Sequence, residues 1–148
     1  MTAGTYYIDR GNLTSTGVTI DGTAGVTTIF GDSTGAGNCG GISFTGNSNV
    51  NITAQPSGNF SGLAFYRSSD CDAEEEFKIA GSSDSTIIGA VYNPSGAIKI
   101  TGNGDVSGTC LQLIADTIKV TGNSDINNSC DSVGTQTIST SSKGSLVE

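Results

Sequence analysis

The sequence predicts an all-β fold, a single-stranded parallel β-helix (β-solenoid) with about five to six irregular coils of roughly 20–27 residues. Three observations lead to this prediction: a nine-residue block recurs, apolar and outward residues alternate inside it, and a Gly-containing turn follows at a fixed place. A single coil of this kind cannot bury its own apolar face, but stacked coils that pair in parallel can. On prevalence alone we expect a right-handed solenoid.

The recurring block is clearest in Ile98-Lys-Ile-Thr-Gly-Asn-Gly-Asp-Val106, which returns 20 residues later as Ile118-Lys-Val-Thr-Gly-Asn-Ser-Asp-Ile126. Looser copies begin at Phe77 and Ile42. Alternation points the first and third residues of each copy inward and the second outward. The turn that follows uses Gly and Asn, which tolerate a positive φ. An antiparallel sandwich is the rival fold, but its strands need not resemble one another as these blocks do.

Stacking predicts that residues at the same place in successive blocks form columns along the solenoid. Two columns are charged, and they must face water, where screening keeps the repulsion between stacked like charges small. The predicted columns are Lys78, Lys99 and Lys119; Asp84, Asp105 and Asp125; and Gly46, Gly81, Gly102 and Gly122.

The remaining segments supply further strands. Residues 5–8, 18–20 and 26–30 precede the first block, and a third strand type recurs at 62–66, 89–92 and 112–115, with Gly89 level with Gln112. The polar and acidic stretch from Ser68 to Glu76 is predicted to be a loop at one corner. We assign residues 1–138 to the β-helix domain and 139–148 to a frayed or vector-derived tail. The start of the chain suggests a segment of a longer protein given an initiator Met.

Composition excludes several classes of function. The chain has 148 residues, 22 Gly and 14% charged residues, which suits one domain of tightly turning strands. Its net charge of −8 and the lack of a basic cluster argue against nucleic-acid binding. No apolar run approaches the length of a membrane span, and no signal peptide is present.

The four cysteines suggest an oxidising, extracytoplasmic setting. Cys110 and Cys130 each lie 12 residues after the start of a block, so they share a place on neighbouring coils. They are either a disulfide, for which the spacing of parallel strands is suitable, or two stacked buried thiols. Cys39 and Cys71 lie in irregular loops and could pair by exclusion. With no CxxC pair and no His, zinc is not expected, and no cofactor is predicted.

The acidic loop contains the strongest cluster of candidate functional residues. Its carboxylates could hold Ca²⁺, but they lack the alternating order of known calcium loops, so a solvated acidic turn is favoured. Two neighbouring residues could complete a recognition patch, although packing of Tyr66 against Tyr92 explains the first equally well. The candidate patch is Tyr66, Arg67, Asp70, Asp72, Glu74, Glu75 and Glu76.

An ordered series of short motifs resembles a known family. The series runs Gly4-Thr-Tyr-Tyr-Ile8, Gly25-Val-Thr-Thr-Ile29, Val50-Asn-Ile-Thr-Ala54, Gly62-Leu-Ala-Phe-Tyr66, Gly89-Ala-Val-Tyr-Asn-Pro-Ser95 and Cys110-Leu-Gln-Leu-Ile-Ala-Asp-Thr117. It is similar to the C-terminal region of bacterial TadE/TadG-like proteins, which are associated with Flp (Tad) pilus assembly, and it covers most of residues 4–130. The resemblance implies a β-rich module in the periplasm or at the cell surface, in a membrane-anchored protein, with no catalytic residues. The chain departs from the family pattern in its acidic loop and in lacking the membrane segment.

The expected function is a non-enzymatic structural or adhesion module of a cell-surface or pilus-associated protein. The alternative is a carbohydrate-binding or carbohydrate-cleaving β-helix, but no carboxylate pair is singled out by spacing and Trp and His are absent. The expected partner is a protein or a surface glycan. Because open coil ends normally need a cap, end-to-end self-association is also expected.

Overall fold

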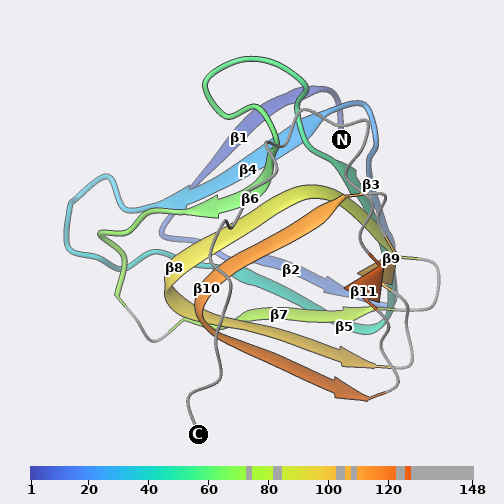
Figure 1. The fold of residues 1–148 in the computed structure, drawn as a ribbon. Helices are drawn as coiled ribbons and strands as arrows, with labels where there is room; N and C mark the ends of the chain where they lie inside the picture. Colours follow the sequence, from blue (N-terminus) through green and yellow to red (C-terminus); the bar gives the residue numbers. More distant parts are fainter. Residues whose placement is uncertain (73–74, 82–84, 103–105, 108–109, 123–125, 128–148) are drawn as a thin grey trace, which may run out of the picture.

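The structure, a computed structural model, describes residues 1–72, 75–81, 85–102, 106–107, 110–122 and 126–127. All regular structure in these ranges is β, so no helix there could cross a membrane (Figure 1). The expected tail at 139–148 and the Asp84, Asp105, Asp125 column lie outside the described residues. The strands are β1 (Gly4–Asp9), β2 (Leu13–Thr16), β3 (Thr19–Gly22), β4 (Val26–Gly31), β5 (Ile42–Thr53), β6 (Leu63–Arg67), β7 (Phe77–Gly81), β8 (Thr86–Gly102), β9 (Val106–Ser107), β10 (Leu111–Gly122) and β11 (Ile126–Asn127).

Nine of the described strands form a parallel sheet that curls into a half-barrel, and β9 and β11 pair in a separate two-stranded sheet (Figure 1). A first row follows the order β1-β4-β6-β8-β10, and a second follows β2-β5-β7-β8-β10. The long strands β8 and β10 bend and belong to both rows. The start of β8 also pairs with the end of β5, which pairs with β3. Every pairing between described strands is parallel.

The register of the second row matches the repeated block. Ile98 pairs with Ile118 on one side and Phe77 on the other, and Lys99 pairs with Lys119 and Lys78. The predicted lysine column is therefore confirmed. The residues before and after each of these lysines point inward, as the alternation of a strand requires.

Two registers differ from the predicted ones. Gly81 pairs with Ser48, not with Gly46, because β5 is irregular between Phe44 and Ser48. Gly46, with φ of 67°, turns the chain inside this irregular stretch. In the first row Gln112 pairs with Ala90, one residue beyond the Gly89 that motif alignment predicts. The irregularity in β5 changes the count of residues on one strand without changing the order of motifs, so alignment alone misses it. The pairing around Gln112 is continuous from Leu111 to Ala115, so there the motif alignment itself was one residue out.

Strand β2 was not predicted, although it begins the second row. Leu13 pairs with Ile42 and Ser15 pairs with Phe44. Ser15 occupies an inward, buried place, and its hydroxyl lies 3.0 Å from that of Ser48. A polar residue at an inward position breaks the apolar alternation that identifies a strand. A hydrogen bond to a second buried hydroxyl makes Ser15 tolerable there.

The core lies between the two rows of the curled sheet. Rings from the first row meet rings from the second: Phe30 contacts Phe77 at 5.5 Å between centroids, and Phe65 contacts Phe44 at 6.0 Å. All four phenylalanines are completely buried. These contacts hold the two rows face to face, because each ring removes a large apolar area from water.

Ile98 and Ile118 provide a matched test of this core. They are paired on neighbouring strands, but Ile98 is fully buried whereas Ile118 is 45% exposed. We expect Ile98→Ala to lower the free energy of unfolding by about 2–5 kcal/mol, the usual loss for a core aliphatic. Ile118→Ala should cost about 1 kcal/mol or less, since little area is removed from water there. Urea unfolding would measure both, and equal losses would contradict the exposed position of Ile118.

Candidate functional site

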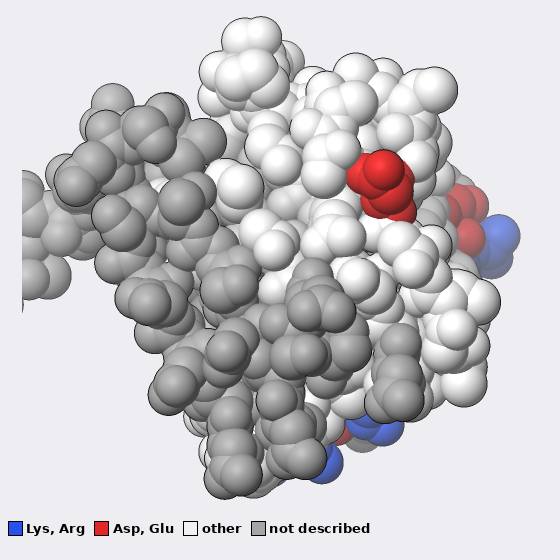
Figure 2. Space-filling model, turned by 90° about the vertical axis from the view of Figure 1, so that its right-hand side faces the viewer, with Lys and Arg blue, Asp and Glu red and all other residues white. Residues whose placement is uncertain are grey.

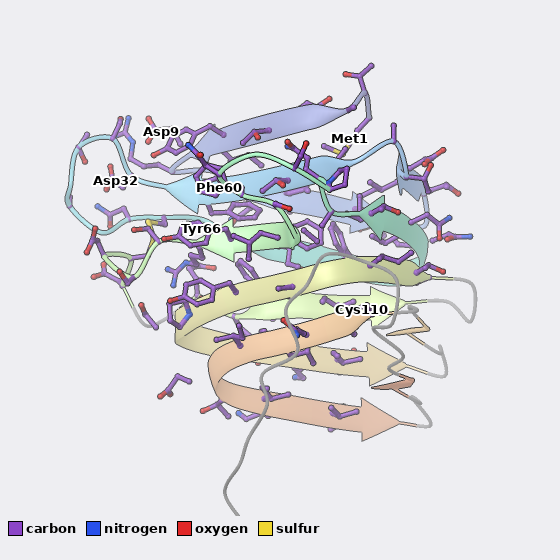
Figure 3. The ribbon with its side chains drawn as sticks, turned by 45° about the horizontal axis from the view of Figure 1, so that its top comes forward. Met1, Asp9, Asp32, Phe60, Tyr66 and Cys110 are labelled. Carbon is purple, nitrogen blue, oxygen red and sulfur yellow. A yellow bond between two sulfur atoms is a disulfide. The ribbon has the colours of Figure 1, made fainter. Side chains whose placement is uncertain are left out.

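Three connecting segments lie side by side at one end of the sheet. We call them the loop edge: residues 10–12, residues 32–41, and the β6–β7 connection, of which residues 68–72 and 75–76 are described. Backbone hydrogen bonds join them: the Leu13 N–H donates to Gly41 O at 2.9 Å, and the Asp72 N–H donates to Gly37 O at 2.9 Å. The edge lies at the left of Figure 3, where Asp9 and Asp32 are labelled. Parallel stacking places it there, because equivalent corners of successive strands leave the sheet at the same end.

A disulfide links two segments of the loop edge. Cys39 and Cys71 are bonded, with their Cα atoms 5.4 Å apart, and both are buried. The pairing expected by exclusion is thus present. Cys110 is also disulfide-bonded, while Cys130, the partner expected from the repeat, lies outside the described residues. The Cys39–Cys71 bond joins two residues that are 32 positions apart in the sequence, and so fixes the β4–β5 loop relative to the β6–β7 loop.

Arg67 is a fully buried cation beneath the loop edge. Its Nε donates to Gly40 O at 3.3 Å and its Nη2 donates to Asp72 O at 2.6 Å, so one side chain holds two loops. Nη1 donates to Asn93 Oδ1 at 3.4 Å. Burial lowers the pKa of Arg67 because desolvation disfavours its charge, and the nearby carboxylates of Glu75 and Asp72 oppose that effect.

Asn93 extends this network to the corner of β8. It is fully buried, and its amide nitrogen donates to Glu75 O at 3.3 Å and to Ala97 O at 3.1 Å. A Cβ added at Gly96 would lie 2.5 Å from Glu75 O and 2.7 Å from the Asn93 amide nitrogen. Gly96 is therefore required for the close approach of the acidic loop to this corner.

The predicted recognition patch is divided by the sheet. Tyr66 points outward, where its ring stacks on Tyr92 at 5.2 Å and contacts Phe60 at 6.0 Å (Figure 3). Arg67, the next residue along the strand, points inward. Neighbouring residues on a strand face opposite sides, so Arg67 cannot join Tyr66 on one exposed surface. The expectation of a single Tyr66–Arg67 patch is corrected accordingly.

The acidic residues of the patch remain at the surface. Asp70, Asp72 and Glu75 are exposed, and Glu76 is half-buried with its carboxylate 3.8 Å from the Lys78 ammonium. Glu74 lies outside the described residues. Among the residues that are described, no three His, Cys, Asp or Glu side chains are grouped closely enough to hold a metal ion.

Two further carboxylates at this edge were not singled out in the sequence. Asp9 accepts hydrogen bonds from the Ser33 N–H and hydroxyl, both at 2.8 Å, and these bonds lower its pKa. The Thr34 hydroxyl, at 2.5 Å, is the chief cause of the lowered pKa of Asp32, which also accepts from the Thr34 and Asn38 N–H groups. Asp32-Ser-Thr is a turn sequence of the kind in which such bonds form, and that signal could have identified it.

Two hollows open along the loop edge. One, of about 230 Å³, is bordered by Arg10, Asn12, Asn38, Asp72 and Glu75 above the buried Arg67. The other, of about 410 Å³, is bordered by Asn12, Thr14, Ser43, Glu75 and Lys78. Charged side chains are few on the face that carries β3, β9 and β11, as far as its described surface in Figure 2 shows.

The fold and the loop edge define a disulfide-linked parallel β-sheet protein with a polar, hollowed edge. Comparisons with family models, with curated proteins and with solved structures found no match to this chain.

Substitution of Arg67, beneath the loop edge, and of Arg10, within it, would test whether Arg67 holds the loops together. Arg67→Met would leave two buried acceptors, on Gly40 and Asn93, and the part-buried carbonyl of Asp72 without their donors. We expect a loss of about 2–4 kcal/mol in the free energy of unfolding, since unpaired buried polar groups are costly. Arg10→Met removes two long ion pairs, both 3.8 Å, in which the arginine side chain is half-exposed, and should cost about 1 kcal/mol or less. Chemical unfolding would measure both variants, and a neutral Arg67→Met would refute the structural role.

Asp9 should make stability depend on pH in the acid range. Its folded pKa is below its unfolded value, so its contribution is present above that unfolded value, about 3.9, and is lost as pH falls through the folded pKa. Asp9→Asn should therefore lower the melting temperature at pH 7 more than at pH 2. A pH-independent effect of Asp9→Asn would contradict the prediction.

Proposed function

We propose that this chain is a rigid, non-enzymatic module of a cell-surface or pilus-associated protein, acting in adhesion or assembly. The observation that carries the proposal is the loop edge, whose segments are held on a continuous parallel sheet by a disulfide and a buried arginine. Loops fixed in this way can present side chains at a surface with little entropy left to lose on binding.

The fold proposed for this module is a right-handed parallel β-helix with five coils. Successive strands of the first and second rows would be the successive coils, and β10 and β11 would belong to the last. The spacing between paired residues supports a coil: it is 20 for Ile98 and Ile118, and 21 for Phe77 and Ile98. It rises to 35 for Ser43 and Lys78, beyond the 20–27 residues expected, since the β5–β6 connection and the acidic loop intervene.

The electrostatics of the loop edge favour a structural role over acid–base catalysis. A general acid needs a pKa raised toward the working pH. Asp9 and Asp32 have lowered pKa values, since local N–H and hydroxyl groups donate to them. Carboxylates engaged in this way shape turns and stay charged. These hydrogen bonds explain the turn geometry at the start of residues 32–41, and no catalytic role is needed to explain it.

Two observations support an extracytoplasmic location in a membrane-anchored protein. The buried Cys39–Cys71 disulfide is of a kind that forms and persists in oxidising compartments. The ordered motifs that resemble TadE/TadG-like proteins point to the same side of the membrane and to pilus assembly.

End-to-end association is the form of assembly that the sheet favours. Among the described strands β10 pairs along one side, with β8, and its inward residues Ile118 and Val120 are 45% and 43% exposed. At the other end β1 and β2 begin the two rows that β10 ends. We propose that the first strands of one copy add to β10 of another, because both carry the same two-row arrangement.

Adhesion is tested with beads coated with the purified chain. We expect beads to be retained on mucin-coated glass or on bacterial layers above the level of albumin-coated beads. Reduction of the protein should abolish retention, because loss of the loop-edge disulfide, which closes a loop of 32 residues, costs about 4 kcal/mol in chain entropy and frees the two loops. Retention equal to albumin on both surfaces would refute adhesion. Release of reducing sugar from a polysaccharide panel would refute the non-enzymatic proposal and favour carbohydrate cleavage.

A further inference from the structure

The two hollows of the loop edge are neighbours that share lining residues, and we call them together the groove. Asn12 and Glu75 border both of them. The groove therefore runs from Arg10 to Lys78, across the corner of the sheet and onto the outer side of β2, β5 and β7. Its combined size exceeds the lower limit of about 300 Å³ that is usual for small-ligand sites.

The walls of the groove are held in place before any ligand arrives. The disulfide and the Arg67 hydrogen bonds fix the loops around its narrower part. Arg67 borders this part but exposes none of its own surface, so it lies beneath the floor. Asn12 accepts from the Gly41 N–H at 2.7 Å through Oδ1, which leaves its amide nitrogen to donate elsewhere.

The lining is polar and its charges balance. Three cationic side chains, Arg10, Arg67 and Lys78, are matched by three acidic ones, Asp72, Glu75 and Glu76. Asp9 and Asp32, which pair with Arg10, add two carboxylates beside it, so such a groove gives no net attraction to an anionic ligand. Its exposed groups include donors on Arg10, Asn12 and Lys78 and acceptors on Asp72, Glu75 and Glu76. This mixture suits hydroxyl groups, because each hydroxyl both donates and accepts.

We propose that the groove binds a neutral oligosaccharide. The proposal rests on the adhesive function above and names the chemical class of its ligand. A peptide fits less well, since peptides gain affinity from apolar or aromatic anchors in apolar pockets, and the apolar Ile42 at this groove is 1% exposed. Sugar hydroxyls would accept from Asn12 and Lys78 and donate to Glu75 and Asp72.

The test is a titration of the ¹⁵N-labelled full chain followed by NMR. The probes are maltotetraose, cellotetraose and chitotetraose, with polygalacturonate fragments as an acidic comparison and a mixed tetrapeptide library as the peptide comparison. We expect at least one neutral tetrasaccharide to shift amide signals of residues 10–14, 37–43 and 75–78. Failure of all three neutral probes at millimolar concentration would overturn the proposal, as would shifts confined to other strands. Binding of only the acidic or peptide probes would overturn the ligand class.

Matched variants locate the binding. Asn12→Asp keeps the acceptor for Gly41 and removes the amide donor, and Lys78→Met removes a cation of the groove. Each should weaken binding about three- to tenfold, the effect of one hydrogen bond. Lys119→Met changes the same outward column two strands away and should leave affinity unchanged. An equal loss in all three variants would overturn the site.

The same variants separate this inference from the adhesive function. Beads coated with Asn12→Asp or Lys78→Met protein should lose retention on mucin along with saccharide binding. Retention that persists without saccharide binding would overturn the inference and leave adhesion standing. Retention absent from the unaltered chain, despite saccharide binding, would refute adhesion and leave the groove as a saccharide site.

Discussion

In-register parallel pairing is the constraint on which the rest of the structure depends. Ile98 lies beside Ile118 on one strand and Phe77 on another, so side chains of like character stack along the sheet. The inward residues of each row then form one continuous apolar surface, and curling of the sheet closes the two surfaces on each other. The same register carries equivalent corners to the same end of the sheet. The loop edge exists because residues 10–12, 32–41, 68–72 and 75–76 all lie in connections between strands at that end.

The sequence was most informative where the repeat is closest and least where polar residues replace core residues. The lysine column and the Ile98 register follow from a block that recurs almost unchanged. Strand β2 was missed because Ser15 stands where an apolar residue is expected, and its partner Ser48 is 33 positions away. The slip at Gly46 was invisible for another reason, since a bulge in β5 adds residues without altering the motif.

Arg67 could have been placed from alternation, but composition pointed the other way. In β6 Phe65 is inward, Tyr66 outward and Arg67 inward, so the period of two assigns the guanidinium to the interior. A charged residue beside an acidic loop reads instead as a surface group. The sequence does not show which groups accept the hydrogen bonds of Arg67. Gly40 and Asn93 lie 27 and 26 positions away from it, and the fold brings them next to Arg67. The groove depends on the same distant segments, and no local motif specifies it.

The constraint that builds the core also determines what is exposed at the ends of the sheet. Ile118 and Val120 occupy the same inward column as the fully buried Ile98 and the almost fully buried Ile100, yet close to half of each is exposed. They differ from those residues in position, not in chemistry, because among the described strands they have a neighbour on one side only. The last described strand of such a sheet has backbone N–H and C=O groups at the spacing with which a further parallel strand would pair. Its inward apolar side chains have the spacing of the core residues that such a strand would add. For this fold the exposed apolar residues of β10 and the polar loop edge are therefore two consequences of one repeat, the first set by the inward column and the second by the corners.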